Sequence, residues 1–367
     1  MKKAVVVTFH CVPNYGAMLQ AYAMQQNLEK FVDTAEILNY VPPHLLRQYH
    51  YFYFKTMRWF LSCLLNFPFT FVRNKKFGSF LKKYLCLTPG VYRVREALTL
   101  DCDYVFLGSD QIWSFGITDG VDKTYFGDFK KKKGCRVIAY AASYGKDILE
   151  ARELALYSAL LKNVDVVAVR ERSAQKAIGF VYPRPVSVVL DPTLLLTREE
   201  WRCVAKKSRL KKYLLLYALN GYDETYRLAA EIAARKGLTV YEIASGGLSF
   251  RARRRHRVIP CAGPSDFLGL IDGSDYVVTD SFHGTAFAVL FKKNFYTVPH
   301  RTKGSRMVDL LKDLRLDGRI VSSFDSEMAI EDIDFTIPSI RLNELRKNSL
   351  AYIRASLDNT PTGQVTR

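Results

Sequence analysis

Short apolar runs alternate with helix-like segments along most of the chain, and the first series lies before residue 197. It contains "KAVVVT", "DYVFLGS", "CRVIAYAAS", "VDVVAVRERS" and "VSVVLDPTLLL", each of which ends in small or polar residues. Apolar runs without strict alternation are typical of parallel strands that are buried on both faces. Segments such as "AMLQAYAMQQNLEKF" and "DILEARELALYSALLKN" separate them with helical spacing of Leu and Ala. The pattern predicts a doubly wound α/β unit.

A second series follows the basic stretch "REEWRCVAKKSRLKK". Its expected strands are "YLLLYALN", "LTVYEIAS", "DYVVTDS" and "NFYTVPH", and its expected helices are "DETYRLAAEIAARKG", "PSDFLGLIDGS", "GTAFAVLFKK" and "SRMVDLLKDLRL". Repeated β–α alternation in two series predicts two Rossmann-like doubly wound domains that face a cleft. The chain of 367 residues is also longer than most chains that fold around a single hydrophobic core.

The predicted domains divide the chain near residues 197–212. We expect an N-terminal domain over residues 1–197 and a C-terminal domain over residues 198–340. We expect a helix over residues 341–357 to return to the N-terminal domain, and a disordered tail over residues 358–367, which has the sequence "DNTPTGQVTR".

Charge is unevenly distributed in this chain of formal charge +18, since residues 37–95 contain no Asp or Glu. Residues 41–95 form an insertion rich in Lys, Arg and aromatic residues, and Asn66 and Pro68 interrupt its apolar run before it is long enough to span a bilayer. Such a stretch predicts a surface that lies on an anionic membrane. The alternative is a helical hairpin packed on its own domain. Nothing resembles a nucleic-acid-binding module, so we expect no nucleic-acid partner.

Cysteine usage and the N-terminus favour a reducing compartment. The seven cysteines show no CxxC and no spacing typical of a zinc site or a disulfide framework, so we expect no metal. The apolar run after "MKK" is too short for a signal peptide and is expected to be the first strand. We therefore predict a cytoplasmic protein that binds peripherally at the inner face of the cytoplasmic membrane.

Polar residues at the ends of expected strands are the candidates for chemistry, because open α/β sheets bind ligands there. Four clusters qualify: Asn14, Tyr15 and Gly16; Ser109, Asp110 and Gln111; Arg170, Glu171, Arg172 and Ser173; and Ser281 to Thr285. Each has a structural alternative, namely turn and capping residues for the first two and solvated surface cations for the arginines. Their convergence on one cleft is the functional hypothesis.

His283, one of only six histidines, lies where an expected strand gives way to a helix. Taken alone, a histidine in this position is more often structural. Its location is nevertheless notable, because we expect Gly284 and Thr285 to leave free backbone N–H groups at the helix N-terminus, which would favour an anion. A histidine beside a bound anion can act as an acid near neutral pH.

Taken together, the motifs resemble those of the polysaccharide pyruvyl transferase family. The carriers are "NYGAMLQAYAM" at 14–24, "FLGSDQIW" at 106–113, "AYAASYG" at 139–145, "VRERS" at 169–173, "LDPTLLL" at 190–196, "DSFHGTAFA" at 280–288 and "KGSRMVDLL" at 303–311. The resemblance implies a GT-B-like fold and transfer of a pyruvyl group from phosphoenolpyruvate to a sugar as a ketal. It implies no further cofactor.

Carried over by position, His283 corresponds to the family's histidine and candidate general acid, and Arg170 to the arginine that binds the anionic donor. Some members have a second arginine where this chain has Ser281. The resemblance then leaves Arg172, Arg301 or Arg306 to complete the donor site, with Ser281, Gly284 and Thr285 as further predicted donor contacts. Asp110 is a candidate base or a hydrogen-bond partner of the sugar. The predicted acceptor contacts are Asn14, Tyr15, Gly16, Ser109 and Gln111.

The predicted acceptor is a lipid-linked oligosaccharide in capsule or exopolysaccharide synthesis, carried on a polyprenyl diphosphate and ending in a galactose-type sugar. Two other functions stay open. One is a nucleotide-sugar-dependent GT-B glycosyltransferase, although the second series offers no clear acidic ribose-binding motif. The other is a non-catalytic carbohydrate-binding protein.

Overall fold

The computed structural model describes residues 1–47, 57–244, 256–300, 304–323, 325 and 327–358. Its first sheet has six parallel strands in the order β2-β1-β4-β6-β7-β8. The strands are β1 (Lys3–Val7), β2 (Thr34–Ile37), β4 (Tyr104–Leu107), β6 (Arg136–Ala142), β7 (Val166–Val169) and β8 (Val186–Val188). Because β2 and β4 flank β1, the strand order reverses direction between β1 and β4.

The second sheet has five parallel strands in the order β11-β10-β9-β12-β13. The strands are β9 (Tyr213–Tyr217), β10 (Thr239–Ile243), β11 (Arg257–Ile259), β12 (Tyr276–Thr279) and β13 (Asn294–Thr297). Here the order reverses between β9 and β12. Such reversals are the points at which open α/β sheets bind ligands.

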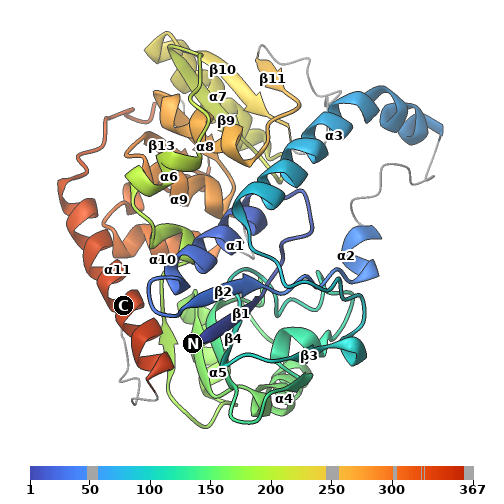
Figure 1. Ribbon diagram of the computed structural model, residues 1–367. Coiled ribbons are helices and arrows are strands. Elements are labelled where there is room, and N and C mark those ends of the chain that lie inside the picture. The colour runs from blue at the N-terminus through green and yellow to red at the C-terminus, as the bar shows by residue number, and fades with distance from the viewer. Residues whose placement is uncertain (48–56, 245–255, 301–303, 324, 326, 359–367) are drawn as a thin grey trace.

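Helices connect the strands in both units, which confirms the predicted fold class of two Rossmann-like domains. Those of the first domain are α1 (Tyr15–Leu28), α4 (Ala151–Leu160) and α5 (Arg172–Gly179), and those of the second are α7 (Asp223–Lys236), α8 (Pro264–Gly273), α9 (Phe282–Leu290) and α10 (Ser305–Asp313). Figure 1 shows one domain above the other, with α1 and α10 between the sheets. A small parallel pair, β3 (Thr99–Leu100) and β5 (Lys130–Lys131), lies outside both sheets.

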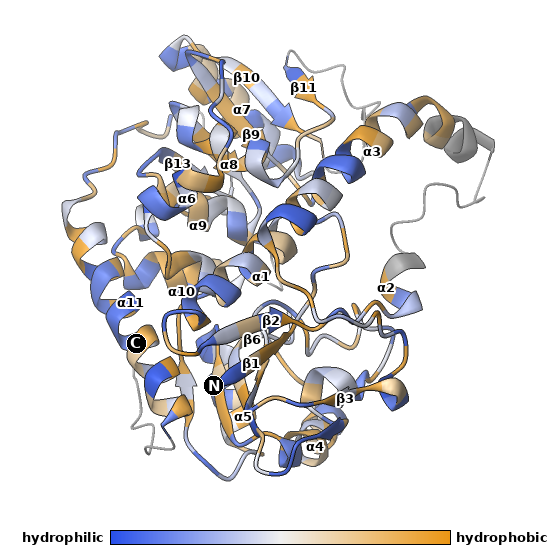
Figure 2. Ribbon diagram, viewed as in Figure 1, coloured by the Kyte–Doolittle hydropathy of each residue, from blue (hydrophilic) through white to orange (hydrophobic). Residues whose placement is uncertain are grey.

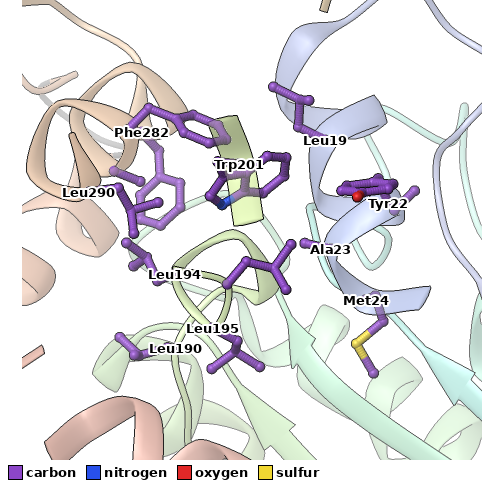
Figure 3. Packing of buried hydrophobic residues seen from close by; sticks show 14 of the residues in the cluster. Leu19, Tyr22, Ala23, Met24, Leu190, Leu194, Leu195, Trp201, Phe282 and Leu290 are labelled. Carbon is purple, nitrogen blue, oxygen red and sulfur yellow. The ribbon is translucent and has the colours of Figure 1, made fainter. Parts of the chain in front are cut away.

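The domains are joined by residues 189–212, which include α6 (Arg198–Val204), and by packing between α1, α6 and α9. The Trp201 ring of α6 lies 5.5 Å from that of Tyr22 on α1 and 5.0 Å from that of Phe287 on α9. Its indole N–H donates to the Thr193 carbonyl oxygen at 2.9 Å. Figure 3 shows Trp201 among side chains from both domains. An aromatic ring shared in this way makes the two domains one packed body.

The C-terminal helix α11 (Thr336–Leu357) packs on the first domain. Ser349 Oγ accepts from the Leu190 N–H at 3.0 Å, and the Tyr104 hydroxyl donates to the Leu357 carbonyl oxygen at 3.2 Å. The helix begins five residues before the predicted start at 341, because Pro338 lies in the first turn, where proline needs no N–H partner. The predicted tail lies outside the described residues, apart from residue 358.

Residues 41–95 contain α2 (Pro43–Arg47) and a long helix, α3 (Met57–Tyr84), which continues through Pro68. α3 packs against α1 and α8 and projects beyond the rest of the molecule (Figure 1). Part of the predicted insertion, residues 48–56, lies outside the described residues. In the part that the structure describes, no helix has both the length and the apolar character required to cross a membrane.

Candidate functional site

A cavity of about 310 Å³ lies at the carboxyl ends of both sheets. Much of its wall comes from the segments that follow β1, β4, β9 and β12, the four strands that flank the two reversals of strand order. Seven predicted site residues line it: Asn14, Gly16, Asp110, Gln111, Ser281, His283 and Arg306. The strand-end clusters of the two domains therefore meet at one cavity.

His283 occupies the first turn of α9, and the cap of that helix uses the neighbouring N–H groups. Ser281 Oγ accepts from the Gly284 N–H at 3.4 Å, and the Ser281 carbonyl oxygen accepts from the Thr285 N–H at 3.0 Å. The expectation that these two N–H groups are free is wrong, because an N-cap serine satisfies them within the helix. Gly284 and Thr285 are buried and do not line the cavity.

Gly16 gives the His283 ring its space. A Cβ at Gly16 would lie 2.1 Å from His283 Nδ1, well inside van der Waals contact. The ring is therefore held between the first turn of α1 in one domain and its own helix in the other. The glycine of "NYGAM" is explained by this close approach, for which glycine is suited.

A buried carboxylate, Asp191, lies behind His283. Its Oδ2 accepts from Arg170 Nη1 at 2.7 Å and from Ser109 Oγ at 2.8 Å, and it lies 3.8 Å from His283 Nε2. Its Oδ1 accepts from the hydroxyl and the N–H of Thr193 at 2.7 and 3.0 Å. Asp191 belongs to the segment "LDPTLLL" but is not among the predicted site residues, although an aspartate directly after an apolar strand run is a usable signal.

Burial and charge set the protonation of this pair. Burial opposes ionisation of Asp191, but the charge that His283 carries at low pH, the charge of Arg170 and the Thr193 hydrogen bonds outweigh it and lower the Asp191 pKa to about 2. Burial lowers the pKa of His283, assisted by Arg170 and Arg306 and opposed by Asp191 and Asp110. In the described part of the chain, His283 Nε2 has no hydrogen-bond partner. The ligand-free site therefore holds an ionised Asp191 beside a largely neutral His283.

Two arginines flank the Phe282 ring but differ in access to the cavity. Arg170 lies 4.6 Å from the ring centroid and is only 1% exposed. Arg306 lies 5.8 Å from the same centroid and lines the cavity. Burial and the proximity of Arg170 lower the Arg306 pKa to about 10, which still leaves it charged at neutral pH. Arg306 Nη2 donates to the Gln111 amide oxygen at 2.9 Å once that amide is oriented to accept.

The other predicted arginines are placed elsewhere. Arg172 joins the domains: its N–H donates to Asp309 at 2.9 Å, and its guanidinium pairs with Asp313. It does not line the cavity. Arg301 lies outside the described residues. Arg306 is thus the candidate cation that the structure brings to the cavity wall.

Two predicted acceptor contacts lie behind the cavity wall. The Tyr15 hydroxyl donates to the Ala262 carbonyl oxygen at 2.7 Å, and its ring stacks on Phe267 at 4.6 Å. Ser109 is fully buried against Asp191. Both side chains support the wall rather than line it.

The second domain adds a polar rim that the sequence analysis did not select. Asp280 accepts from the N–H groups of Leu219 and Asn220 at 2.6 and 2.8 Å. Burial raises its pKa, although these N–H groups oppose the rise. His300 and Tyr217 also line the cavity. Asp280 follows β12 directly, so the strand-end rule that selected His283 was sufficient to select it too.

The composition of the wall suits an anion next to a hydroxyl-rich ligand. Arg306 provides positive charge, while His283, Asp110, Asn14 and Gln111 offer hydrogen-bonding groups. Among the described residues, no group of three or more His, Cys, Asp or Glu is placed to hold a metal ion.

Comparison with known families gives one match. The model of the polysaccharide pyruvyl transferase family matches residues 14–301, the greater part of the chain. The match includes His283, Asp191 and Asp110 but ends before Arg306. No curated protein matches the sequence significantly.

Three similar solved structures bear the names of epimerases. UDP-GlcNAc 2-epimerases from Neisseria meningitidis and Methanocaldococcus jannaschii each give a TM-score of 0.51 at 13% identity, over 98% of this chain and 100% and 98% of theirs. A putative UDP-N-acetylglucosamine 2-epimerase from Listeria monocytogenes gives 0.50 at 11% identity, over 99% of this chain and 98% of its own. Likeness at this identity shows the GT-B-type fold alone.

Proposed function

Since the chain belongs to the polysaccharide pyruvyl transferase family, we propose that it moves a pyruvyl group from phosphoenolpyruvate onto two hydroxyls of a sugar. The observation that carries the proposal is that His283, Arg306 and Asp110 line the same cavity. A proton carrier, a cation and a carboxylate are the groups that this reaction requires. The product is a cyclic ketal, and inorganic phosphate leaves.

The first step adds a proton and a sugar oxygen across the enol double bond. Protonated His283 gives its proton to the methylene carbon, which becomes a methyl group, and the adjacent carbon acquires oxocarbenium character. A sugar hydroxyl attacks that carbon and loses its proton to Asp110. A second hydroxyl then attacks the same carbon and closes the ring, while the C–O bond to phosphate breaks and the departing phosphate takes up the proton of that hydroxyl. General acid–base help of this kind typically contributes about 10²–10⁴-fold.

The donor itself helps to protonate His283. Burial lowers the His283 pKa in the empty site. A bound phosphate and carboxylate would raise it, because nearby negative charge favours the imidazolium. The second pKa of a phosphate monoester is about 6, so near neutral pH the donor phosphate is mostly a dianion, which strengthens this effect. The acid thus forms mainly when donor is present.

Arg306 would bind the anionic donor in place of the second arginine that some family members have at the position of Ser281. It lines the cavity, and in the described part of the chain its Nε has no hydrogen-bond partner. A guanidinium matches a carboxylate or phosphate through two parallel hydrogen bonds. Arg170, buried below Phe282, acts on the donor through Asp191 and through its charge.

For the acceptor we propose a lipid-linked oligosaccharide with a terminal galactose-type sugar. Asn14, Asp110 and Gln111 offer hydrogen-bonding groups to sugar hydroxyls from the first-domain wall. The acid-free segment at residues 37–95 supports a diphosphate-bearing carrier, since cations there have few intramolecular partners nearby in sequence.

The test is mass spectrometry of candidate acceptors after incubation with phosphoenolpyruvate. We expect a gain of one pyruvyl group and release of phosphate, both lost in His283→Gln. His44→Gln is the matched control, because His44 does not line the cavity. Release of a nucleotide from a nucleotide sugar, with no use of phosphoenolpyruvate, would overturn the proposal in favour of a glycosyltransferase.

A further inference from the structure

The long helix α3 has two faces of different character. Asn66, Arg73, Phe77 and Phe80 are buried. At about 100° per residue these four positions lie on one side of the helix. Arg73 donates to the Pro13 carbonyl oxygen at 2.5 Å, while Phe77 and Phe80 join the core that α1 and α9 share. This side fixes α3 to the body of the protein.

The opposite side exposes large apolar side chains in the N-terminal half. Leu64, Leu65, Phe71 and Val72 are 53%, 64%, 51% and 42% exposed. Figure 2 shows this apolar part of α3 where the helix projects from the molecule. Scattered exposed apolar residues need no explanation, but a cluster on one helix face marks an interaction site. We name these four residues the apolar face of α3.

Lysines continue the same side toward the C-terminus. Lys75, Lys82 and Lys83 are exposed, and among the described residues none of them pairs with a carboxylate. The nearest acidic residues in sequence are Glu36 and Glu96, which bound the acid-free segment on either side. The outward side of α3 therefore presents apolar side chains followed by uncompensated positive charge.

We propose that the apolar face of α3 inserts into the surface of an anionic bilayer while these lysines contact lipid phosphates. Amphipathic helices bind membranes through this combination of apolar insertion and attraction to anionic headgroups. The same face of a second copy fits less well, because residues 37–95 contain no Asp or Glu that could pair with these lysines.

Docking here would also orient the cavity. α3 is tied to the cavity wall, since Arg73 holds Pro13 next to Asn14, and Lys76 pairs with Asp266 of α8 at 2.7 Å. A helix lying on the bilayer would keep the cavity at a set distance from a lipid-borne sugar. Only this last step rests on the proposed function; the membrane surface itself does not.

The experiment is flotation of the full chain with vesicles of phosphatidylcholine alone or mixed with phosphatidylglycerol, without donor or acceptor. We expect binding to the mixed vesicles that weakens with salt, and at least about a tenfold loss in Leu65→Asp/Phe71→Asp. Phe180→Asp is the matched control, since Phe180 is 85% exposed at the end of α5, away from this face. Circular dichroism checks that all variants fold.

Three outcomes would overturn the inference. The first is wild-type protein whose binding does not depend on phosphatidylglycerol, and the second is a double variant that floats as wild type does. The third is a dimer in light scattering that is lost in the double variant, with no binding to vesicles, which would assign the face to a second copy. Turnover of a water-soluble acceptor separates this result from a failure of the proposed reaction, because it needs no bilayer.

Discussion

The carboxyl ends of the two sheets meet at the cavity, and the polar residues that follow them are held in place by different interactions. Below, the first edge and the second edge mean the carboxyl ends of the first and the second sheet. At the first edge, Asp191, Arg170 and Ser109 form a buried network of side-chain hydrogen bonds and opposite charges. At the second edge, Asp280 is held by backbone N–H groups, and His283 by the cap of its helix and the gap above Gly16. Polar residues beyond the first sheet are thus held in place mainly by charged side chains, and those beyond the second sheet mainly by backbone groups.

The charged side chains and the histidine whose pKa they influence therefore lie in different parts of the chain. Arg170 belongs to the first domain and Asp191 to the segment that joins the two domains, yet both act on the pKa of His283 in the second. The Arg172–Asp313 pair and the Trp201 packing hold the domains together. Because Coulomb interactions weaken with distance, any opening between the domains would change the basicity of the histidine.

The largest expected effect comes from breaking the charged edge. Asp191→Ala leaves Arg170 buried beside the more distant Asp110 and Glu171, at 3.8 and 3.9 Å. We expect a loss of about 3–5 kcal/mol in the free energy of unfolding, the usual cost of a buried charge that has lost its partner. Urea unfolding measures it. Asp110→Ala is the control, since Asp110 is partly exposed, and equal losses in both variants would contradict the comparison.

The next effect comes from filling the gap at the backbone-held edge. In Gly16→Ala the new methyl group would lie 2.1 Å from His283 Nδ1, so the ring must move. A shift of about 1 Å in a catalytic group can cost about 10²-fold in rate. We expect that loss in kcat for pyruvyl transfer, with a smaller change in stability.

The matched glycine for that experiment is Gly78 on α3, where an added Cβ meets nothing within 4 Å. Gly78→Ala should keep full activity and gain stability of about 0.5–1 kcal/mol, because alanine favours a helix interior. Full activity in Gly16→Ala would show that the ring position is not what the glycine protects.

Sequence patterns predicted which strands surround this site, because both sheets are parallel and buried. Unbroken runs such as "DYVVTDS" marked the strands, and the residues after them marked one edge of each sheet. That rule led to Asp110 and His283, which line the cavity together. The link between the domains also matched a visible change in composition, the basic stretch around α6.

Side-chain direction was beyond reach of the same rule. Arg170 and Arg172 are two residues apart, yet one is buried beneath Phe282 and the other pairs with α10 of the second domain. Ser109 and Asp191 meet across 82 positions of sequence. Such choices depend on long-range packing, which periodicity does not encode.

A moderate effect is expected from changing the cation at the cavity wall. Arg306→Lys keeps a positive charge but loses the fork that can bind a carboxylate with two hydrogen bonds. We expect KM for phosphoenolpyruvate to rise about tenfold, with kcat changed less, in steady-state assays of phosphate release. Arg172→Lys is the control and should leave KM near wild type, because Arg172 does not line the cavity. A larger rise in KM for Arg172→Lys than for Arg306→Lys would indicate that Arg172, not Arg306, binds the donor.

The smallest expected effect is on the pH dependence of stability in the ligand-free protein. Burial lowers the His283 pKa in the folded state, so below about pH 6.5 the unfolded chain binds a proton that the folded protein resists. Stability from this group is therefore complete above that pH and declines as pH falls. Thermal unfolding from pH 8 to pH 5 should show a shallower decline in His283→Gln. Phosphoenolpyruvate should also flatten the decline in the wild-type protein, since its charge favours the imidazolium. If the wild type and His283→Gln lose stability equally as pH falls, His283 is not the titrating group. Buried His10, whose pKa burial also lowers, would then be the candidate source.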